Sequence, residues 1–235
     1  MKKIYLNLLK LFRIVINIII IFLPWNIRRY ILNKIYKYQI GKGCHIGLAY
    51  IYPKTLIMED GSIIKHFNIA INLDSIILKK NALIDRSNWI TGFPTETNSA
   101  FFKGEKERKS QLLMGENSVI TKKHHFDCTN EIKIGNFATI AGYNSQFLTH
   151  SINPYSNRQE SKPIQISDYS FISTNVIVLG GSYLPPKSIL GAGAVLNKNY
   201  AHNADHGLYV GVPAYRKKEI DKDALYFKRK KRDVF

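Results

Sequence analysis

The sequence contains little cysteine, and this shortage excludes two classes of protein. Only two of its 235 residues are cysteine, Cys44 and Cys128. They cannot form a disulfide framework, and no pair of cysteines has the spacing of a zinc site. We expect both to be small buried groups in a protein of a reducing compartment.

Acidic residues are also scarce relative to basic ones. The chain has 34 Lys and Arg against 17 Asp and Glu, a formal net charge of +17. Such an excess favours an anionic partner: the phosphates of a cofactor, an acidic lipid surface or nucleic acid. The basic residues are dispersed and no recognised nucleic-acid motif is present, so we expect no nucleic-acid partner. The cluster Lys228–Arg232 is predicted to be a solvated, frayed tail.

No apolar run is long enough to cross a bilayer. The longest stretch near the N-terminus, Ile18–Leu23, is far below the ~20 residues of a span, and polar residues interrupt the wider window. No small-residue cleavage site follows it. Residues 1–38 are therefore predicted to be helical, with two interpretations left open. One is an amphipathic helix on a membrane surface, with headgroup contacts from Trp25, Arg28, Arg29 and Tyr30. The other is a helix packed on the protein or on a neighbouring subunit.

The sequence does contain a six-residue repeat, between Ile166 and Lys198. An aliphatic residue opens each hexad: Ile166, Ile172, Val178, Leu184, Leu190 and Leu196. A small or β-branched residue follows four places later: Ser170, Val176, Ser182, Ser188 and Ala194. A helix with 3.6 residues per turn cannot keep a six-residue step on one face. Short strands joined by tight turns can, and three such units form one coil of a parallel β-solenoid with the aliphatic residues inside.

Weaker hexads begin at Ile40, and their register slips, which predicts irregular first coils. Two stretches interrupt the repeat, 91–111 and 151–163, and we expect both to be loops. The predicted organisation is a helical segment at 1–38, a β-helix at 39–215 and a basic tail with a short helix at 216–235.

Two further motifs flank the repeat, Leu148–Ser151 (LTHS) before it and Gly211–Ala214 (GVPA) after it, and the repeat itself contains Leu190–Gly193 (LGAG). Together with the hexads, over roughly residues 114–218, they resemble the hexapeptide-repeat acyltransferases. The similarity is to acetyl-CoA-dependent O-acetyltransferases of galactosides and surface polysaccharides. This resemblance implies a left-handed parallel β-helix and a homotrimer with active sites between subunits. It also implies a sugar hydroxyl as acceptor, on a surface polysaccharide or its lipid-linked precursor. The expected location is the cytoplasm, at the inner face of the membrane if residues 1–38 bind lipid.

His150 is the candidate general base. It lies where the repeat gives way to an excursion, and a neutral imidazole accepts a proton at physiological pH. The family's catalytic histidine occupies this place, and the resemblance implies direct transfer without an acyl-enzyme. Candidate acceptor-binding residues are His125, Asp127, Asn144 and Gln146. Asp127 is suited either to bind a sugar hydroxyl or to orient an imidazole, and the alternative is a polar face with one histidine packed between coils.

The resemblance places coenzyme A contacts at Thr174, Ala192, Asn197, Lys198, Arg216 and Lys218. The basic members supply cations for the phosphates. His124, His125 and His150 also suggest the three-histidine zinc site of the γ-class carbonic anhydrases, which share this fold. Adjacent residues of a strand point to opposite faces, however, so no metal is expected.

Two rival functions remain. One is N-acyl transfer to an amine of a nucleotide sugar or an antibiotic, which the repeat cannot distinguish from O-acyl transfer. The other is a non-catalytic β-helix scaffold. The presence of His150, Lys198 and the GVPA motif together argues against the scaffold.

Overall fold

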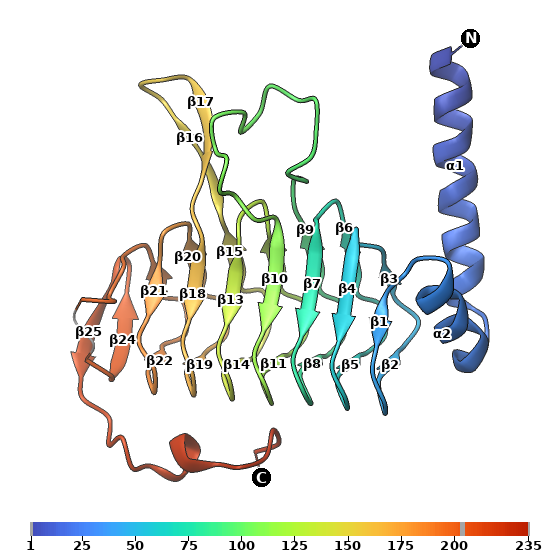
Figure 1. The fold of residues 1–235 in the computed structure, drawn as a ribbon. Coiled ribbons are helices and arrows are strands. Elements are labelled where there is room, and N and C mark those ends of the chain that lie inside the picture. Colours follow the sequence, from blue (N-terminus) through green and yellow to red (C-terminus); the bar gives the residue numbers. More distant parts are fainter. Residues whose placement is uncertain (1, 203–204, 235) are drawn as a thin grey trace.

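The computed structural model describes residues 2–202 and 205–234, and it is a parallel β-helix with helices at its N-terminal end (Figure 1). Met1, Asn203, Ala204 and Phe235, which fall within the predicted segments, lie outside the described residues. Three sheets form the sides of the prism. Sheet A contains β1 (Gln39–Ile40), β4 (Thr55–Met58), β7 (Ser75–Leu78), β10 (Gln111–Met114), β13 (Ile132–Ile134), β18 (Ile164–Ile166) and β21 (Tyr183–Leu184).

The other two sides follow the same order along the chain. Sheet B contains β2 (His45–Ile46), β5 (Ile63–Ile64), β8 (Leu83–Ile84), β11 (Val119–Ile120), β14 (Thr139–Ile140), β19 (Phe171–Ile172), β22 (Ile189–Leu190), β24 (Leu208–Gly211) and β25 (Ala214–Lys218). Sheet C contains β3 (Tyr50–Ile51), β6 (Ile69–Ile71), β9 (Trp89–Thr91), β12 (His125–Asp127), β15 (Gln146–Leu148), β20 (Ile177–Leu179) and β23 (Val195–Leu196). Apart from the terminal β24–β25 pair, neighbouring strands in the three sheets are parallel.

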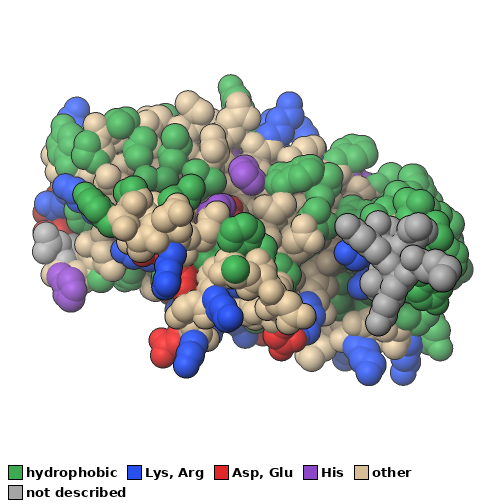
Figure 2. All heavy atoms as spheres, turned by 90° about the horizontal axis from the view of Figure 1, so that it is seen from above, with side chains coloured by type: hydrophobic (Ala, Val, Ile, Leu, Met, Phe, Trp, Pro, Cys, Tyr) green, Lys and Arg blue, Asp and Glu red, His purple; other side chains and the backbone are tan. Residues whose placement is uncertain are grey.

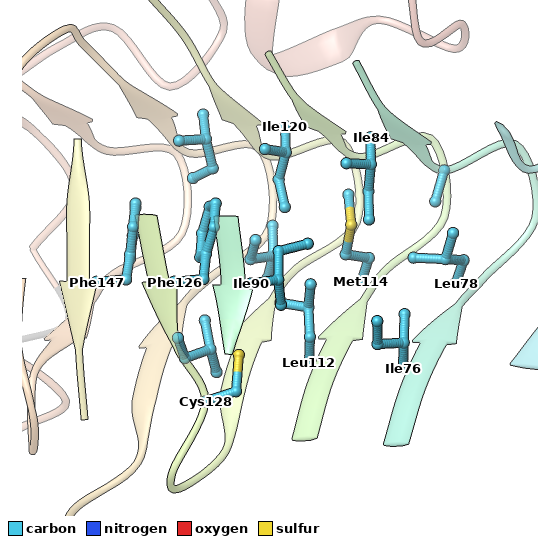
Figure 3. Close-up of a cluster of buried hydrophobic side chains, with 14 of the residues drawn as sticks. Ile76, Leu78, Ile84, Ile90, Leu112, Met114, Ile120, Phe126, Cys128 and Phe147 are labelled. Carbon is cyan, nitrogen blue, oxygen red and sulfur yellow. The ribbon is translucent and has the colours of Figure 1, made fainter. Parts of the chain in front are cut away.

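The hexad openers point into the prism, as predicted. All six between Ile166 and Leu196 are fully buried, and the small or β-branched residues four places later are buried at the corners. Figure 3 shows the same arrangement in the central coils, where Phe126 and Phe147 of adjacent coils stack with ring centroids 4.7 Å apart. Both cysteines are buried and unpaired, as expected. Each fully buried large apolar side chain contributes about 1.5–3 kcal/mol to folding.

The strands of the first coils pair in an unbroken ladder, and the predicted irregularity is confined to the lengths of their turns. Met58 pairs with Leu78 and Ile64 with Ile84, so this coil has two residues more than the eighteen of three hexads. The extra residues lie in the turn from sheet C to sheet A, between β6 and β7. We call this line of turns the C–A edge. Each coil can lengthen there without moving its inward residues.

Two helices close the N-terminal end: α1 (Lys2–Ile21) and α2 (Trp25–Lys34). Among the described residues, neither helix has the length and apolarity needed to cross a membrane. Arg28 is buried and donates to the carbonyl oxygens of Gly47 (2.7 Å) and Ala49 (2.9 Å). Arg29 donates to those of Ile40 (3.0 Å) and Gly41 (2.9 Å).

These contacts correct the assignment of Arg28 and Arg29 to lipid headgroups. The first coil has no preceding coil to donate to its carbonyl groups, and exposed strand edges require such partners. The two arginines supply them. Trp25 also packs on the first coil, with its ring centroid 4.9 Å from that of His45.

The C-terminal segment is not a free tail, contrary to the prediction. Arg216 and Lys218 belong to β25, which pairs antiparallel with β24 at the end of sheet B. After a short 3₁₀ helix, Leu225–Lys228, the chain runs back along the solenoid (Figure 1). Arg229 donates to the carbonyl of Phe137, and Arg232 to that of Asn81 at 3.3 Å. Lys228, Lys230 and Lys231 are exposed, so only part of the basic cluster is solvated.

Candidate active site

Both interruptions of the repeat leave the prism at the C–A edge. Residues 92–110 connect β9 to β10, so Thr91 and Gln111 of the predicted excursion belong to strands. The second excursion is a β-hairpin of β16 (His150–Asn153) and β17 (Arg158–Ser161), where a loop was predicted. Figure 1 shows the loop and the hairpin rising together on the same side of the solenoid. The edge therefore collects the irregular parts of the chain in one place.

His150 lies at the base of the hairpin and is paired with Asp127 of the preceding coil. Its Nδ1 is 2.5 Å from Asp127 Oδ2, and its backbone N–H donates to the same oxygen at 3.2 Å. An ionised carboxylate only accepts hydrogen bonds, so Nδ1 carries the proton and Nε2 is the ring nitrogen free to accept one. The His150 side chain is 44% exposed, whereas that of Asp127 is 8% exposed.

The surroundings of Asp127 keep it ionised. Burial raises its pKa, but hydrogen bonds from His150 and from the Thr129 hydroxyl (2.7 Å) and N–H (3.1 Å) outweigh this effect and lower the pKa below its usual value. The hydrogen bond to Asp127 raises the pKa of His150 above 6.5, and partial burial opposes that shift. The arrangement is a histidine held in one tautomer by a buried carboxylate, with one ring nitrogen able to accept a proton.

The loop and the hairpin are fastened to each other beside this pair. Glu105 of the loop accepts from the Ser161 N–H (2.6 Å) and hydroxyl of β17. Buried Arg108 donates to carbonyls of Phe93, Pro94 and Thr129, joining the loop to the coil that carries Asp127. A cleft of about 1040 Å³ lies between the two excursions, lined by both.

Phe102 is the loop residue that reaches His150. Its ring meets the imidazole edge to face, with centroids 6.1 Å apart and planes at 89°. The guanidinium of Arg108 lies 4.8 Å from the centre of the same ring. An aromatic wall thus borders the candidate base on one side and reduces the access of water to it.

Two of the predicted acceptor residues lie side by side on the outer face of sheet C. His125 is in register with Gln146 of the next coil and with Trp89 of the previous one. Asn144 lies at the adjacent corner, and all four line a shallow pocket of about 570 Å³. His125 is two residues from Asp127, about 7 Å along the strand. The row Trp89, His125 and Gln146, which we call the sheet C shelf, adjoins the His150–Asp127 pair.

His124 is a core histidine. Its Nδ1 accepts from the Ser145 N–H at 3.2 Å, and its Nε2 lies 3.0 Å from the Thr121 hydroxyl. Burial lowers the pKa of His124 to about 4, so it stays neutral. Within the described residues, no group of three side chains is arranged to hold a metal ion.

The residues predicted for coenzyme A fall into three groups. Thr174 and Ala192 occupy the same corner, between sheets B and C, in consecutive coils, where the Gly193 N–H donates to the Thr174 carbonyl at 3.1 Å. Asn197 and Lys198 follow β23 at the C–A edge and are exposed. Arg216 and Lys218 lie on β25, and Arg216 is engaged by the His206 carbonyl (3.1 Å) and by Glu219 (3.7 Å).

Five residues at the site went unpredicted: Trp89, Phe102, Glu105, Arg108 and Thr129. Thr129 follows Asp127 at the Asp-x-Thr spacing of a local side-chain turn, which is a readable signal. The loop residues carry no such signal, because their contacts depend on how residues 92–110 fold over the edge.

Comparison with known proteins shows what class of fold carries this site. No protein-family model matches the chain, and no curated protein matches it. Among solved structures, the polysialic acid O-acetyltransferase OatWY superposes with a TM-score of 0.50 and 14% identity, over 77% of this chain and 88% of that one. The hexapeptide-repeat acetyltransferase VCA0836 from Vibrio cholerae O1 biovar eltor, complexed with acetyl-coenzyme A, superposes with a TM-score of 0.47 and 19% identity, over 68% of this chain and 70% of that one. A maltose O-acetyltransferase from Clostridium difficile 630 superposes with a TM-score of 0.40 and 15% identity, over 83% of this chain and 75% of that one.

The chain therefore has the fold of the hexapeptide-repeat acetyltransferases, a left-handed parallel β-helix, and the predicted fold class is confirmed. At such low identity the likeness concerns the fold alone, and the reaction has to be argued from the site.

Proposed function

We propose that this protein is an acetyl-CoA-dependent O-acetyltransferase that modifies a hydroxyl of a surface-polysaccharide sugar or of its precursor. The observation that carries the proposal is the His150–Asp127 pair at the C–A edge of this fold, next to Phe102 and Ser161, which line the cleft. A sugar hydroxyl has a pKa far above 7, so its attack on a thioester requires a base. A neutral imidazole oriented by a buried carboxylate meets that requirement.

In the proposed reaction, His150 Nε2 removes the proton of the acceptor hydroxyl as its oxygen bonds to the thioester carbonyl carbon. The carbon–sulfur bond breaks, and the imidazolium returns its proton to the departing thiolate. The products are an acetyl ester and free coenzyme A, and His150 is neutral again. Asp127 stabilises the imidazolium while it exists and keeps Nε2 directed toward the acceptor.

The predicted coenzyme A residues offer two features suited to the co-substrate. At the Thr174–Ala192 corner, a side chain built on Gly193 would meet no atom within 4 Å, so the backbone there is open to a close approach by an extended ligand. Lys198 is an exposed cation on the same edge as His150, suited to a phosphate. Arg216 would have to exchange its contact with Glu219 for a phosphate, which makes it the weakest member of the predicted set.

The sheet C shelf is the proposed acceptor site. Trp89 is 48% exposed and offers an aromatic surface to the apolar face of a sugar ring. His125 and Gln146 beside it provide groups that can bond sugar hydroxyls. We further propose that the enzyme is a homotrimer, with the cleft completed by a neighbouring subunit, and that it works in the cytoplasm, where acetyl-CoA is made.

The proposal is tested by measuring coenzyme A release from acetyl-CoA with a panel of surface glycans and matched amino sugars. His150→Ala should lower kcat by at least about a hundredfold. The bond formed distinguishes the rival N-acyl transfer, because hydroxylamine cleaves an acetyl ester and leaves an amide intact. A His150→Ala variant with near-normal turnover, or an exclusively hydroxylamine-resistant product, would refute the proposal. Absence of transfer together with absence of acetyl-CoA binding would favour the scaffold.

A further inference from the structure

Helix α1 turns its polar side toward the protein. Lys10, Arg13 and Asn17 line a pocket between α1 and the first coils. Asn17 is buried, donates to the Tyr50 hydroxyl (3.2 Å) and accepts from the Tyr36 hydroxyl (2.6 Å). These bonds fix the rotation of the helix about its own axis. The side of α1 that would face water in an ordinary surface helix is therefore directed at the body.

The opposite side of α1 is apolar and uncovered. Its exposed large side chains are Tyr5, Leu8, Leu9, Leu11, Phe12, Ile14, Val15, Ile18 and Ile19, and Phe22 follows directly after the helix. At 100° per residue they occupy roughly 200° of the helix circumference. A surface helix of a globular protein has the reverse arrangement, with its apolar stripe on the core. An apolar patch of this extent marks an interaction surface.

The charge at this end of the molecule identifies the kind of partner. No Asp or Glu occurs before Glu59, whereas Lys34 and Lys37 are exposed after α1, and Lys10 and Arg13 are exposed at the rim of the pocket under it. A second copy of the chain would bring like charges against this end of the molecule. An anionic lipid surface complements both the charge and the apolar face.

We propose that α1 lies in the surface of an anionic membrane, with its apolar side at the boundary between headgroups and acyl chains. Figure 2 shows hydrophobic side chains gathered at the α1 end of the molecule, viewed from the side on which the loop and the hairpin project. The pocket under α1 also includes Pro94 and Glu96 of that loop. The membrane-binding element and the candidate cleft thus share one edge. This inference does not depend on the proposed reaction.

The test is co-sedimentation of the full-length protein with vesicles of phosphatidylglycerol or of phosphatidylcholine. The wild type should sediment with the first and remain in solution with the second. The variant Phe12→Glu/Ile19→Glu, altered at two exposed positions of α1, should bind phosphatidylglycerol vesicles roughly a hundredfold more weakly. The control Leu225→Glu/Val234→Glu adds the same charge at two exposed apolar positions of the C-terminal segment, on the side away from the loop and the hairpin, and should bind like the wild type.

Three results would overturn the inference. If the wild-type protein stays in solution with phosphatidylglycerol vesicles, the inference is refuted, whatever the variants do. If the helix variant binds phosphatidylglycerol vesicles as tightly as the wild type, the binding comes from the basic solenoid and not from α1. The third result combines two measurements: the wild type does not bind vesicles, and the helix variant no longer self-associates in light scattering. The apolar side of α1 would then be an interface between copies of the chain. Transfer to a soluble acceptor is measured in parallel, so failure of the membrane inference and failure of the proposed reaction are distinguishable.

Discussion

The two site residues with the firmest geometry, His150 and Asp127, have pKa values shifted in opposite directions, and the hydrogen bond between them contributes to both shifts. Each shift stabilises the charged pair relative to its neutral form. The cost is that the candidate base stays protonated to a higher pH than an isolated histidine. The benefit is a fixed tautomer, with the proton on Nδ1 and Nε2 free.

Replacing Asp127 with Asn should therefore change the pH profile in a defined direction. In the wild type, kcat/KM should rise as pH increases through the raised pKa of His150, if His150 is the base. Without the carboxylate that pKa falls back toward 6.5, so the rise should occur at lower pH. The maximal rate should also fall roughly a hundredfold or more, because the useful tautomer is no longer held. A variant with a lowered rate and an unmoved profile would mean that Asp127 only shapes the fold.

Trp89 gives the second prediction at this scale. If its ring supports a sugar, Trp89→Ala should raise KM for the acceptor about tenfold, with KM for acetyl-CoA unchanged. Trp89→Phe should restore most of the affinity, which a purely structural role of the indole would not explain. Equal losses for both substrates, measured by initial rates over a matrix of concentrations, would contradict the assignment.

At the scale of elements, the solenoid itself was predictable and its edge was not. The inward positions repeat at six residues, so Ile166 to Leu196 reveal the coils directly. The first coils looked irregular because their additional residues lie in turns of the C–A edge, which displaces the hexads without disturbing the pairing of Met58 with Leu78. The hairpin β16–β17 has no comparable sequence signal, because none of its strand residues is fully buried. Ser151, Ile152 and Glu160 therefore show no alternation between buried and exposed positions.

The same limit explains the site. His150 was found because it interrupts a pattern, and Asp127 because it lies one coil earlier. The clasp between Glu105 and Ser161 joins residues 56 apart in sequence, through two segments without a repeat. Arg28 was misassigned for a related reason, because sequence cannot distinguish an arginine that faces lipid from one that faces unpaired carbonyl groups.

Helix α2 yields a prediction at the element scale. Arg28→Ala should destabilise the protein by about 3 kcal/mol, because it leaves the buried carbonyl groups of Gly47 and Ala49 without charged donors. Lys34→Ala removes the same charge from an exposed position of the same helix and should have little effect. Urea unfolding monitored by circular dichroism measures both. Equal stabilities of the two variants would show that the first coil needs no cap from α2.

At the scale of the whole molecule, the C-terminal segment changes the way stability is distributed. A solenoid is held together by contacts between neighbouring coils, so its stability is close to a sum of local terms. Here the segment crosses several coils. The Tyr226 hydroxyl lies 3.4 Å from the Ser170 carbonyl, Arg229 donates to Phe137, and Arg232 donates to Asn81. This strap thus connects the coil of Asn81 with the coils of Phe137 and Ser170, with which it shares no strand pairing.

Arg229 is the strongest point of this strap, since its guanidinium also lies against the rings of Tyr226, Phe137 and Tyr169. Arg229→Ala/Arg232→Ala should lower Tm by at least about 4 °C, given the loss of hydrogen bonds from two charged donors and 2–4 °C per kcal/mol for a chain of about this size. Lys230→Ala/Lys231→Ala removes the same charge from neighbouring exposed positions and should leave Tm within about 1 °C. Calorimetry at one ionic strength makes the comparison direct. If both double variants melt with the wild type, the segment only lies on the solenoid, and the coils carry their stability locally from end to end.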